Sequence, residues 1–219
     1  MRIKSKTASL IWKALIVVVG LVGLVIGTGV FKGAFNPLIF GMFTTISNAI
    51  VVVYFFVALV VLGGRTSASP TFCPLFKQIV TMGITVTFLV AHFFLSNLLY
   101  TDDVLNVDML ILHYIVPIMT ILDWLLFDEK GRMRAWAPFL WTILPLAYLA
   151  VVEVAINAWG FSFSGGVEGA SDYPYPFLDA ATLGWPRVIG LICALVAAFI
   201  VLGYVWRAID GVLARAGRK

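Results

Sequence analysis

The sequence predicts an all-α, polytopic membrane protein, with six transmembrane helices forming a single domain over residues 1–219. Its residues are 62% hydrophobic and only 12% charged, whereas soluble domains are about 45–50% apolar and about 25% charged. The hydrophobic residues also gather in long runs, and a helix needs about 20 of them to cross a bilayer. The net charge of +4 fits the topology of a membrane protein and gives no reason to expect a nucleic-acid partner.

Six segments meet the length and composition of a span, and they run over about 10–31, 37–62, 75–100, 104–127, 136–158 and 184–208. The first is longer than the hydrophobic region of a signal peptide, which is about 7–15 residues. No small-x-small cleavage site follows it, so we expect a retained span. Charged residues, glycine or proline mark the breaks between spans, and the one long connection covers 159–184.

The distribution of positive charge predicts that the N- and C-termini are both cytoplasmic. With six spans, every Lys and Arg except Lys32 and Arg187 lies on the side of the two termini. Cytoplasmic loops carry such an excess of Lys and Arg. The opposite side holds acidic residues instead, namely Asp102, Asp103, Glu168, Asp172 and Asp179.

Several polar residues are expected at one depth, in the outer half of the membrane domain. A helix rises about 1.5 Å per residue, which puts Thr45 and His92 at ~12 Å and His113 at ~14 Å from the outer ends of their spans. The layer comprises Thr44, Thr45, Ser47, Asn48, His92, Ser96, His113 and Glu153. Ionisable residues within spans are costly and often functional. The same residue types also hydrogen-bond between helices simply as packing contacts.

Asp123 lies about one turn from the inner end of the fourth span. A carboxylate there is unfavourable with the helix dipole. We therefore expect it to pair with a nearby cation in the following loop, with Lys130, Arg132 and Arg134 as the candidates. This favours a structural role for Asp123 over a chemical one.

Three chemistries are open to the polar layer. A hydroxyl becomes a nucleophile beside a neutral histidine, so Thr45 with His113 as base predicts an intramembrane acyl hydrolase. Asn48 would then orient Thr45 or donate to the oxyanion. A zinc site of His92, His113 and Glu153 is the second possibility, although no H-E-x-x-H motif is present. Transport is the third, with the two histidines along a pathway, but no internal repeat supports it.

Three short stretches resemble the androgen-induced six-transmembrane hydrolase family. They are F-T-T-I-S-N at 43–48, L-H-Y-I-V-P followed by I-L-D-W at 112–124, and Y-P-F-L-D at 175–179. The six-span layout over most of the chain is similar as well. Members of this family are threonine hydrolases that cleave fatty acid esters of hydroxy fatty acids. The resemblance implies a bacterial relative, held in the inner (plasma) membrane as a multi-pass protein.

The resemblance also implies roles for particular residues. Thr45 matches the nucleophile of the family and Asn48 its polar partner, while Thr44 takes that place if the register slips by one. His113, with an acidic residue ten positions later, matches the histidine. The proline follows that histidine by four positions here, against five in animal members. The outer loop motif comprises Tyr175, Pro176, Phe177, Leu178 and Asp179.

Together these observations predict a lipid ester hydrolase that needs no cofactor or metal and acts on a fatty-acyl ester within a lipid membrane. Thr45 and His113 are the expected catalytic pair, supported by Asn48 and Thr44. We expect four further residues to line or support the site: His92, Ser96, Glu153 and Asp123. A non-enzymatic transporter or structural protein remains the main alternative, ahead of a zinc-dependent hydrolase.

Overall fold

The computed structural model describes residues 2–64, 71–94, 99–101, 104–167 and 170–217. Within them, six helical segments are long and apolar enough to cross a membrane. They are α1 (Lys6–Gly27), α2 (Phe43–Gly63), α3 (Pro74–Phe94), the segment Val107–Phe127, the segment Ala137–Trp159 and α9 (Trp185–Ala216). The chain is therefore a multi-pass integral membrane protein, as its composition predicts.

Two of these segments are built from shorter helices. Val107–Phe127 consists of α4 (Val107–Leu110), the π-helix η4 (Ile111–Ile115) and α5 (Val116–Phe127). Ala137–Trp159 consists of α6 (Ala137–Leu140) and α7 (Ile143–Trp159). Short elements connect the segments: η1 (Val30–Lys32), η2 (Pro37–Gly41), β1 (Tyr100–Thr101), β2 (Val104–Leu105), η5 (Pro176–Leu178) and α8 (Ala180–Leu183).

The ends of several spans differ from the predicted ones, and α2 begins at Phe43 rather than at 37 because residues 37–41 form η2. β1 and β2 pair antiparallel, with Tyr100 opposite Leu105. The predicted third and fourth spans therefore extend too far, since 100 and 104 lie in this hairpin. The last helix continues to Ala216 rather than ending near 208. Its final turns carry Arg207, Asp210 and Arg215, which a hydropathy criterion excludes although they are compatible with a helix.

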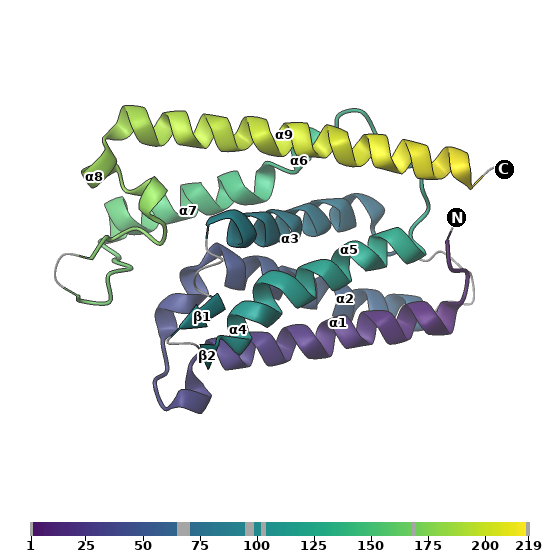
Figure 1. The fold of residues 1–219 in the computed structure, drawn as a ribbon, viewed down its shortest axis with the longest axis horizontal. Helices are drawn as coiled ribbons and strands as arrows, with labels where there is room; N and C mark the ends of the chain where they lie inside the picture. The colour runs from purple at the N-terminus through teal and green to yellow at the C-terminus, as the bar shows by residue number, and fades with distance from the viewer. Residues whose placement is uncertain (1, 65–70, 95–98, 102–103, 168–169, 218–219) are drawn as a thin grey trace.

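The six segments pack as a bundle with both termini at the same end (Figure 1). We call this the terminal end. The opposite end, which carries the β1–β2 hairpin, α8 and residues 160–167 and 170–179, is the loop end. An even number of spans accounts for this arrangement. In Figure 1, α1 and α9 lie on opposite sides of the bundle, with α3 and α7 between them.

The most tightly packed part of the bundle is formed by α1, α2, α3 and α5. Its core includes the fully buried side chains of Ile16, Val51, Phe55, Ile84 and Val116. Glycines let α1 approach its neighbours closely. A Cβ atom at Gly20 would lie 2.5 Å from Val52 Cγ2, and one at Gly23 would lie 2.5 Å from Ile111 Cγ2. Small residues serve the same purpose in other membrane helix interfaces.

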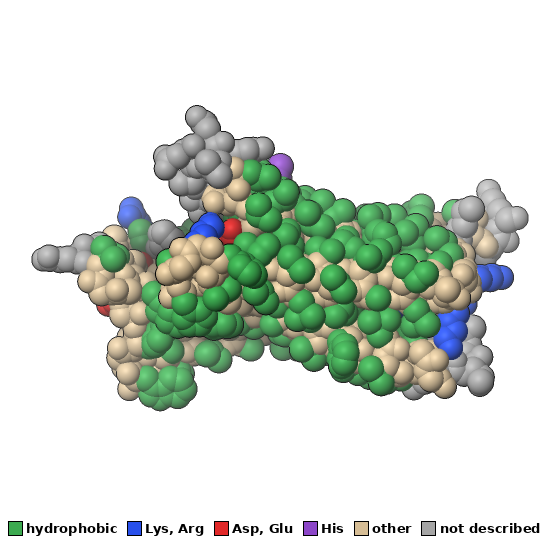
Figure 2. Space-filling view, turned by 90° about the horizontal axis from the view of Figure 1, so that it is seen from below, with side chains coloured by type: hydrophobic (Ala, Val, Ile, Leu, Met, Phe, Trp, Pro, Cys, Tyr) green, Lys and Arg blue, Asp and Glu red, His purple; other side chains and the backbone are tan. Residues whose placement is uncertain are grey.

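α7 and α9 are peripheral by comparison, and most of their side chains are exposed. α9 contacts the rest of the bundle at several points along its length. It contacts α8 and η5 at the loop end, Gly203 near its middle packs against Pro138 and Trp141, and Asp210 toward the terminal end accepts from Gly131 N and Met133 N. The space-filling view shows hydrophobic side chains over the middle of one face and Lys or Arg side chains at its two ends (Figure 2). This is the surface that a bilayer-spanning bundle requires.

Asp123 is part of a buried ion cluster between α1, α3 and α5, so the predicted pairing with the 130–134 cations is wrong. Lys13 Nζ lies 2.8 Å from Asp123 Oδ1, and Lys77 Nζ also binds Asp123. Lys77 Nζ lies 2.6 Å from Asp128 Oδ1 as well. Lys130 instead donates to the Trp124 carbonyl. Lys13 and Lys77 pair with Asp123 in place of Lys130. Both side chains point into the bundle from neighbouring helices, where water cannot solvate a charge.

Candidate functional site

Thr44 and His113 meet near the loop end of the bundle. Thr44 Oγ1 lies 3.0 Å from His113 Nε2. Thr44 is the second residue of α2, and His113 is the middle residue of the π-helix η4. Both side chains are half-buried. The predicted layer therefore does bring a threonine of the second span and the histidine of the fourth into hydrogen-bond contact.

The second ring nitrogen of His113 defines the direction of this hydrogen bond. His113 Nδ1 lies 3.2 Å from the Met109 carbonyl oxygen. A carbonyl only accepts, so Nδ1 carries the hydrogen, and in the neutral ring Nε2 is then an acceptor. The Thr44 hydroxyl consequently donates to Nε2. This is the arrangement in which a histidine is ready to remove the hydroxyl proton.

The local helix geometry around His113 is irregular. Pro117 has no N–H to donate to the carbonyl of His113, which an α-helix would require. The chain forms a π-helical turn over Ile111–Ile115 just before it. Such turns are often found at functional sites. Ile111 and Leu112 pack against Gly23 of α1, and this contact holds the irregular turn against the core.

Asn48 joins the two halves of the site through backbone groups. Its Nδ2 donates to the Thr44 carbonyl at 2.8 Å and to the Leu112 carbonyl at 3.0 Å. Because both partners are acceptors, both amide hydrogens are in use. Asn48 therefore cannot donate to an oxyanion. Its two hydrogen bonds instead position the start of α2 against η4.

A cavity of about 250 Å³ opens beside Thr44 and His113. Its walls come from α2, α3, α7, α9 and residues 175–178. Most lining side chains are hydrocarbon: Val86, Val90, Pro145, Leu146, Leu149, Leu191, Ile192, Leu195, Val196 and Phe199 among them. The polar lining residues are Thr44, Thr87, His113, Tyr148 and Tyr175. A pocket with an apolar body and few polar groups is typical of a small-molecule site.

The predicted outer loop motif forms part of this cavity. Tyr175, Phe177 and Leu178 line it, and the Tyr175 and Phe177 rings stack with centroids 5.4 Å apart. Burial raises the pKa of the Tyr175 hydroxyl, and the neighbouring polar groups of Thr44 and Phe43 oppose that shift. Tyr175 and Thr44 both line the cavity.

Asp179 holds the loop in place from outside the cavity. It caps α8, with Oδ1 accepting from Thr182 N at 3.0 Å. Its Oδ2 accepts from the hydroxyls of Ser171 and Thr182, each at 2.8 Å. Hydrogen bonds from Ser171 and then Thr182 lower the pKa of the Asp179 carboxyl. The motif therefore divides into residues that face the cavity and an aspartate that anchors them.

Other predicted site residues lie elsewhere. Thr45, one position from Thr44, is buried and is not among the lining residues. His92 is exposed and stacks on Phe88, with centroids 6.0 Å apart. Glu153 binds Asn157 and Tyr173 and does not line the cavity. Asp123 is about 15 Å from His113 along the helix. Ser96 lies outside the described residues.

The residues of the zinc alternative do not come together. Among the described residues, no group of three or more His, Cys, Asp or Glu side chains is placed to hold a metal ion. His92, His113 and Glu153 all belong to the described part of the chain. The polar lining residues that the sequence did not predict are Thr87 and Tyr148, and the Tyr148 hydroxyl donates to the Gly41 carbonyl at 3.0 Å just before α2. A single tyrosine in an apolar span does not by itself predict that its side chain lines a functional cavity.

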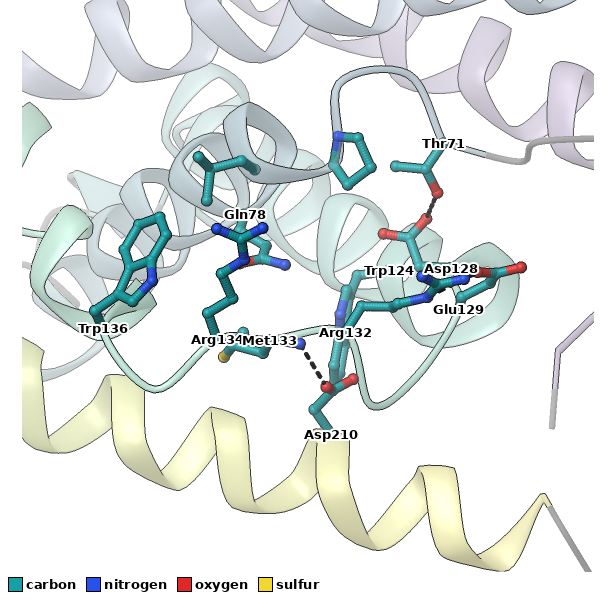
Figure 3. A pocket seen from close by; sticks show the side chains of 12 residues that line it. Thr71, Gln78, Trp124, Asp128, Glu129, Arg132, Met133, Arg134, Trp136 and Asp210 are labelled. Carbon is teal, nitrogen blue, oxygen red and sulfur yellow. Dashed lines mark hydrogen bonds and ion pairs between the residues drawn. The ribbon is translucent and has the colours of Figure 1, made fainter.

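A second, larger cavity of about 570 Å³ lies at the terminal end (Figure 3). It is lined by the start of α3, the end of α5, residues 128–136 and Asp210 of α9. Its described lining residues include no histidine, and the hydroxyl of Thr71 donates to the Asp128 carboxylate at 2.8 Å. The two cavities therefore differ in chemistry, and of the two only the one at Thr44 pairs a hydroxyl with an imidazole.

The comparisons with known proteins add no relative to this description. No protein-family model matches the chain, and neither a curated protein nor a solved structure matches it.

Proposed function

We propose that the protein is an intramembrane hydrolase of lipid carboxylic esters, with Thr44 as nucleophile and His113 as general base. The observation that carries this proposal is the 3.0 Å contact between Thr44 Oγ1 and His113 Nε2, two residues that line an apolar cavity. Packing between α2 and η4 would by itself explain a hydrogen bond between these two side chains. It would not explain an open cavity beside that bond.

In the first step, Thr44 Oγ1 attacks the ester carbonyl carbon and its proton passes to His113 Nε2. The tetrahedral intermediate collapses to an acyl ester of Thr44, and the leaving alkoxide takes the proton from Nε2. In the second step, water attacks the acyl ester and gives a proton to Nε2. The carboxylic acid leaves, and the proton returns to Thr44.

Donors for the oxyanion come from the start of α2 and from the loop. The first hydrogen bond of α2 runs from Ile46 N to the Met42 carbonyl, so the N–H groups of residues 43–45 precede the helical ladder. They carry the positive end of the helix dipole. Tyr175, which lines the cavity together with Phe43 and Thr44, adds a hydroxyl group. Donors preorganised in this way stabilise the developing negative charge.

The lining of the cavity favours a fatty-acyl ester over a polar one. His113 is the only ionisable lining residue other than the two tyrosines among the described residues. Burying a charged or unpaired polar group against such walls is costly, whereas each CH₂ group buried contributes about 0.8 kcal/mol. Pro145 and Phe199 each lie about 21 Å from the loop-end terminus of their helices, so they mark the far end of the cavity.

The transport alternative finds less support in this arrangement. It requires His92 and His113 along one pathway, but His92 is exposed outside the cavity. With the positive-inside pattern of the sequence, we place both termini in the cytoplasm and the Thr44 site toward the outer leaflet of a bacterial plasma membrane. The resemblance to the androgen-induced six-transmembrane hydrolases supports the same chemistry.

Covalent labelling of the purified protein by an alkyl fluorophosphonate tests the proposal. We expect labelling of the natural protein, loss in Thr44→Ala and His113→Ala, and retention in Thr45→Ala. Thr45 is a matched control, because it is the same residue type, one position along the same helix and buried. A labelled peptide identified by mass spectrometry should carry the adduct at Thr44.

Two results would contradict the proposal. Labelling that survives both Thr44→Ala and His113→Ala would mean that this pair is not the reactive site. Loss in Thr45→Ala together with retention in Thr44→Ala would return the nucleophile to the residue that the sequence motif favours.

A further inference from the structure

The cavity at the terminal end offers a second binding site, unrelated to the proposed hydrolysis. It lies where a bilayer-spanning bundle meets water, because α3 begins there at Pro74 and the loop 128–136 crosses it. Trp124 and Trp136 both line it. Tryptophan is enriched at membrane–water interfaces. The cavity is therefore within reach of lipid headgroups.

The acidic side chains in its wall are already satisfied within the protein. Asp128 accepts from Lys77 at 2.6 Å and from the Thr71 hydroxyl at 2.8 Å. Asp210 accepts from the backbone N–H groups of Gly131 and Met133 at 2.9 and 3.2 Å. Figure 3 shows the contacts of Thr71 with Asp128 and of Met133 with Asp210. Glu129 pairs with Arg132 and Arg2.

Two lining side chains have unused hydrogen-bonding capacity. Arg134 forms no ion pair within the described part of the chain, and its guanidinium lies 5.6 Å from the Trp136 ring centroid. It points from the loop toward Gln78 of α3 (Figure 3). Gln78 Oε1 is buried and has no hydrogen-bond donor among the described residues. Leaving a buried acceptor unpaired costs free energy, so a ligand that supplies a donor would be favoured.

These groups together describe the ligand. Arg134 is a fork of N–H donors that suits a phosphate, and none of the three acidic lining residues forms an ion pair with it in the described part of the chain. Gln78 Oε1 requires a hydroxyl or similar donor close to that phosphate. Leu75 lines the cavity and is 42% exposed, so an apolar surface adjoins the polar groups.

We propose that this cavity binds a phosphate ester that carries a neighbouring hydroxyl group, supplied by the headgroup of an anionic phospholipid. Arg134 binds the phosphate and Gln78 accepts from the hydroxyl. Phosphatidylglycerol has both features. Phosphatidylmethanol has the same charge without the hydroxyl, whereas phosphatidylcholine has neither a net charge nor a donor.

Native mass spectrometry of the full chain, released from nanodiscs of these three lipids, tests the assignment. We expect retention to fall from phosphatidylglycerol to phosphatidylmethanol to phosphatidylcholine. Arg134→Gln should weaken retention of both anionic lipids by about tenfold or more. Gln78→Leu should remove only the difference between phosphatidylglycerol and phosphatidylmethanol. Arg215→Gln is the control, since it removes an exposed cation at the same end that does not line the cavity.

Several outcomes would overturn the assignment. They are equal retention of the three lipids by the natural protein, undiminished retention by Arg134→Gln, and an equal loss in Arg215→Gln. Complete displacement of the lipid by millimolar inorganic phosphate would assign the site to free phosphate and overturn the lipid source. If Arg134→Gln does not fold, Arg134→Lys keeps the charge without the fork and should retain the lipid less well than the natural protein.

Discussion

Lys13 Nζ and Asp123 Oδ1 lie 2.8 Å apart with both side chains fully buried, although 110 positions separate them in the chain. Lys77 shares Asp123 with Lys13 and also binds Asp128. Two cations and two anions thus form a neutral cluster that ties α1, α3 and α5 together. Charges in such a place are tolerated because each has a partner.

Removing the central carboxylate should destabilise the protein strongly. Asp123→Asn leaves two buried cations, Lys13 and Lys77, and a single carboxylate, that of Asp128. Breaking a buried pair costs about 3–5 kcal/mol. Thermal unfolding in detergent should show a clear fall in Tm. The exposed pair Arg132–Glu129 is the comparison, and Arg132→Gln should change stability by only about 0–1 kcal/mol. Equal effects of the two changes would show that the cluster does not hold the helices together.

Phe199→Ala should extend the acyl cavity and shift the preference of the hydrolase toward longer chains. The removed ring lies at the far end of the cavity, so the change should leave the environment of Thr44 as it is. Rates with butanoyl, octanoyl, dodecanoyl and hexadecanoyl esters measure the shift. Val201→Ala is a matched control because that side chain is 64% exposed on the same helix. An unchanged profile in Phe199→Ala, with hydrolysis intact, would place the acyl chain elsewhere.

Tyr175→Phe removes one hydroxyl beside Thr44 and keeps the ring packing. If this hydroxyl donates to the oxyanion, kcat should fall about 10²–10³-fold, with little change in KM. Tyr204→Phe, on an exposed tyrosine of α9, should have no effect on either constant. A rise in KM at constant kcat would instead assign Tyr175 to substrate binding.

Asp179 should make the order of the outer loop depend on pH. Its carboxyl pKa is held below the ordinary value of 3.8. Its contribution to stability is therefore present above pH 3.8 and is lost as the pH falls through the lower folded value. Limited proteolysis of residues 160–184 should consequently increase only in acid.

Two variants separate the charge of Asp179 from its capping role. Asp179→Asn keeps a capping oxygen and should abolish the acid dependence with little loss of stability. Asp179→Ala should cost about 1 kcal/mol at neutral pH, since it removes the cap of α8. Acid sensitivity that persists in Asp179→Asn would show that another group is responsible.

Some features of the site could be predicted from sequence and others could not. The meeting of a second-span threonine with His113 follows from comparing depths along the spans, because helical rise is regular. The choice of partner for Asp123 was wrong, since nearness in sequence favoured Lys130, Arg132 and Arg134. Lys13 and Lys77 are on other helices, and only packing places them at that carboxylate. His92 shares the predicted depth but faces outward, because depth contains no information on the rotation of a helix.

Composition and hydropathy alone establish a membrane protein with six spans, because apolar runs of this length have one stable environment. The same information places a hydroxyl and an imidazole at similar depth. It cannot choose between Thr44 and Thr45, since neighbouring residues on a helix point about 100° apart. That choice depends on how α2 is rotated against η4, and this rotation is decided by long-range contacts such as those of Asn48 and Gly23. The tertiary structure brings Thr44, and not Thr45, into contact with His113.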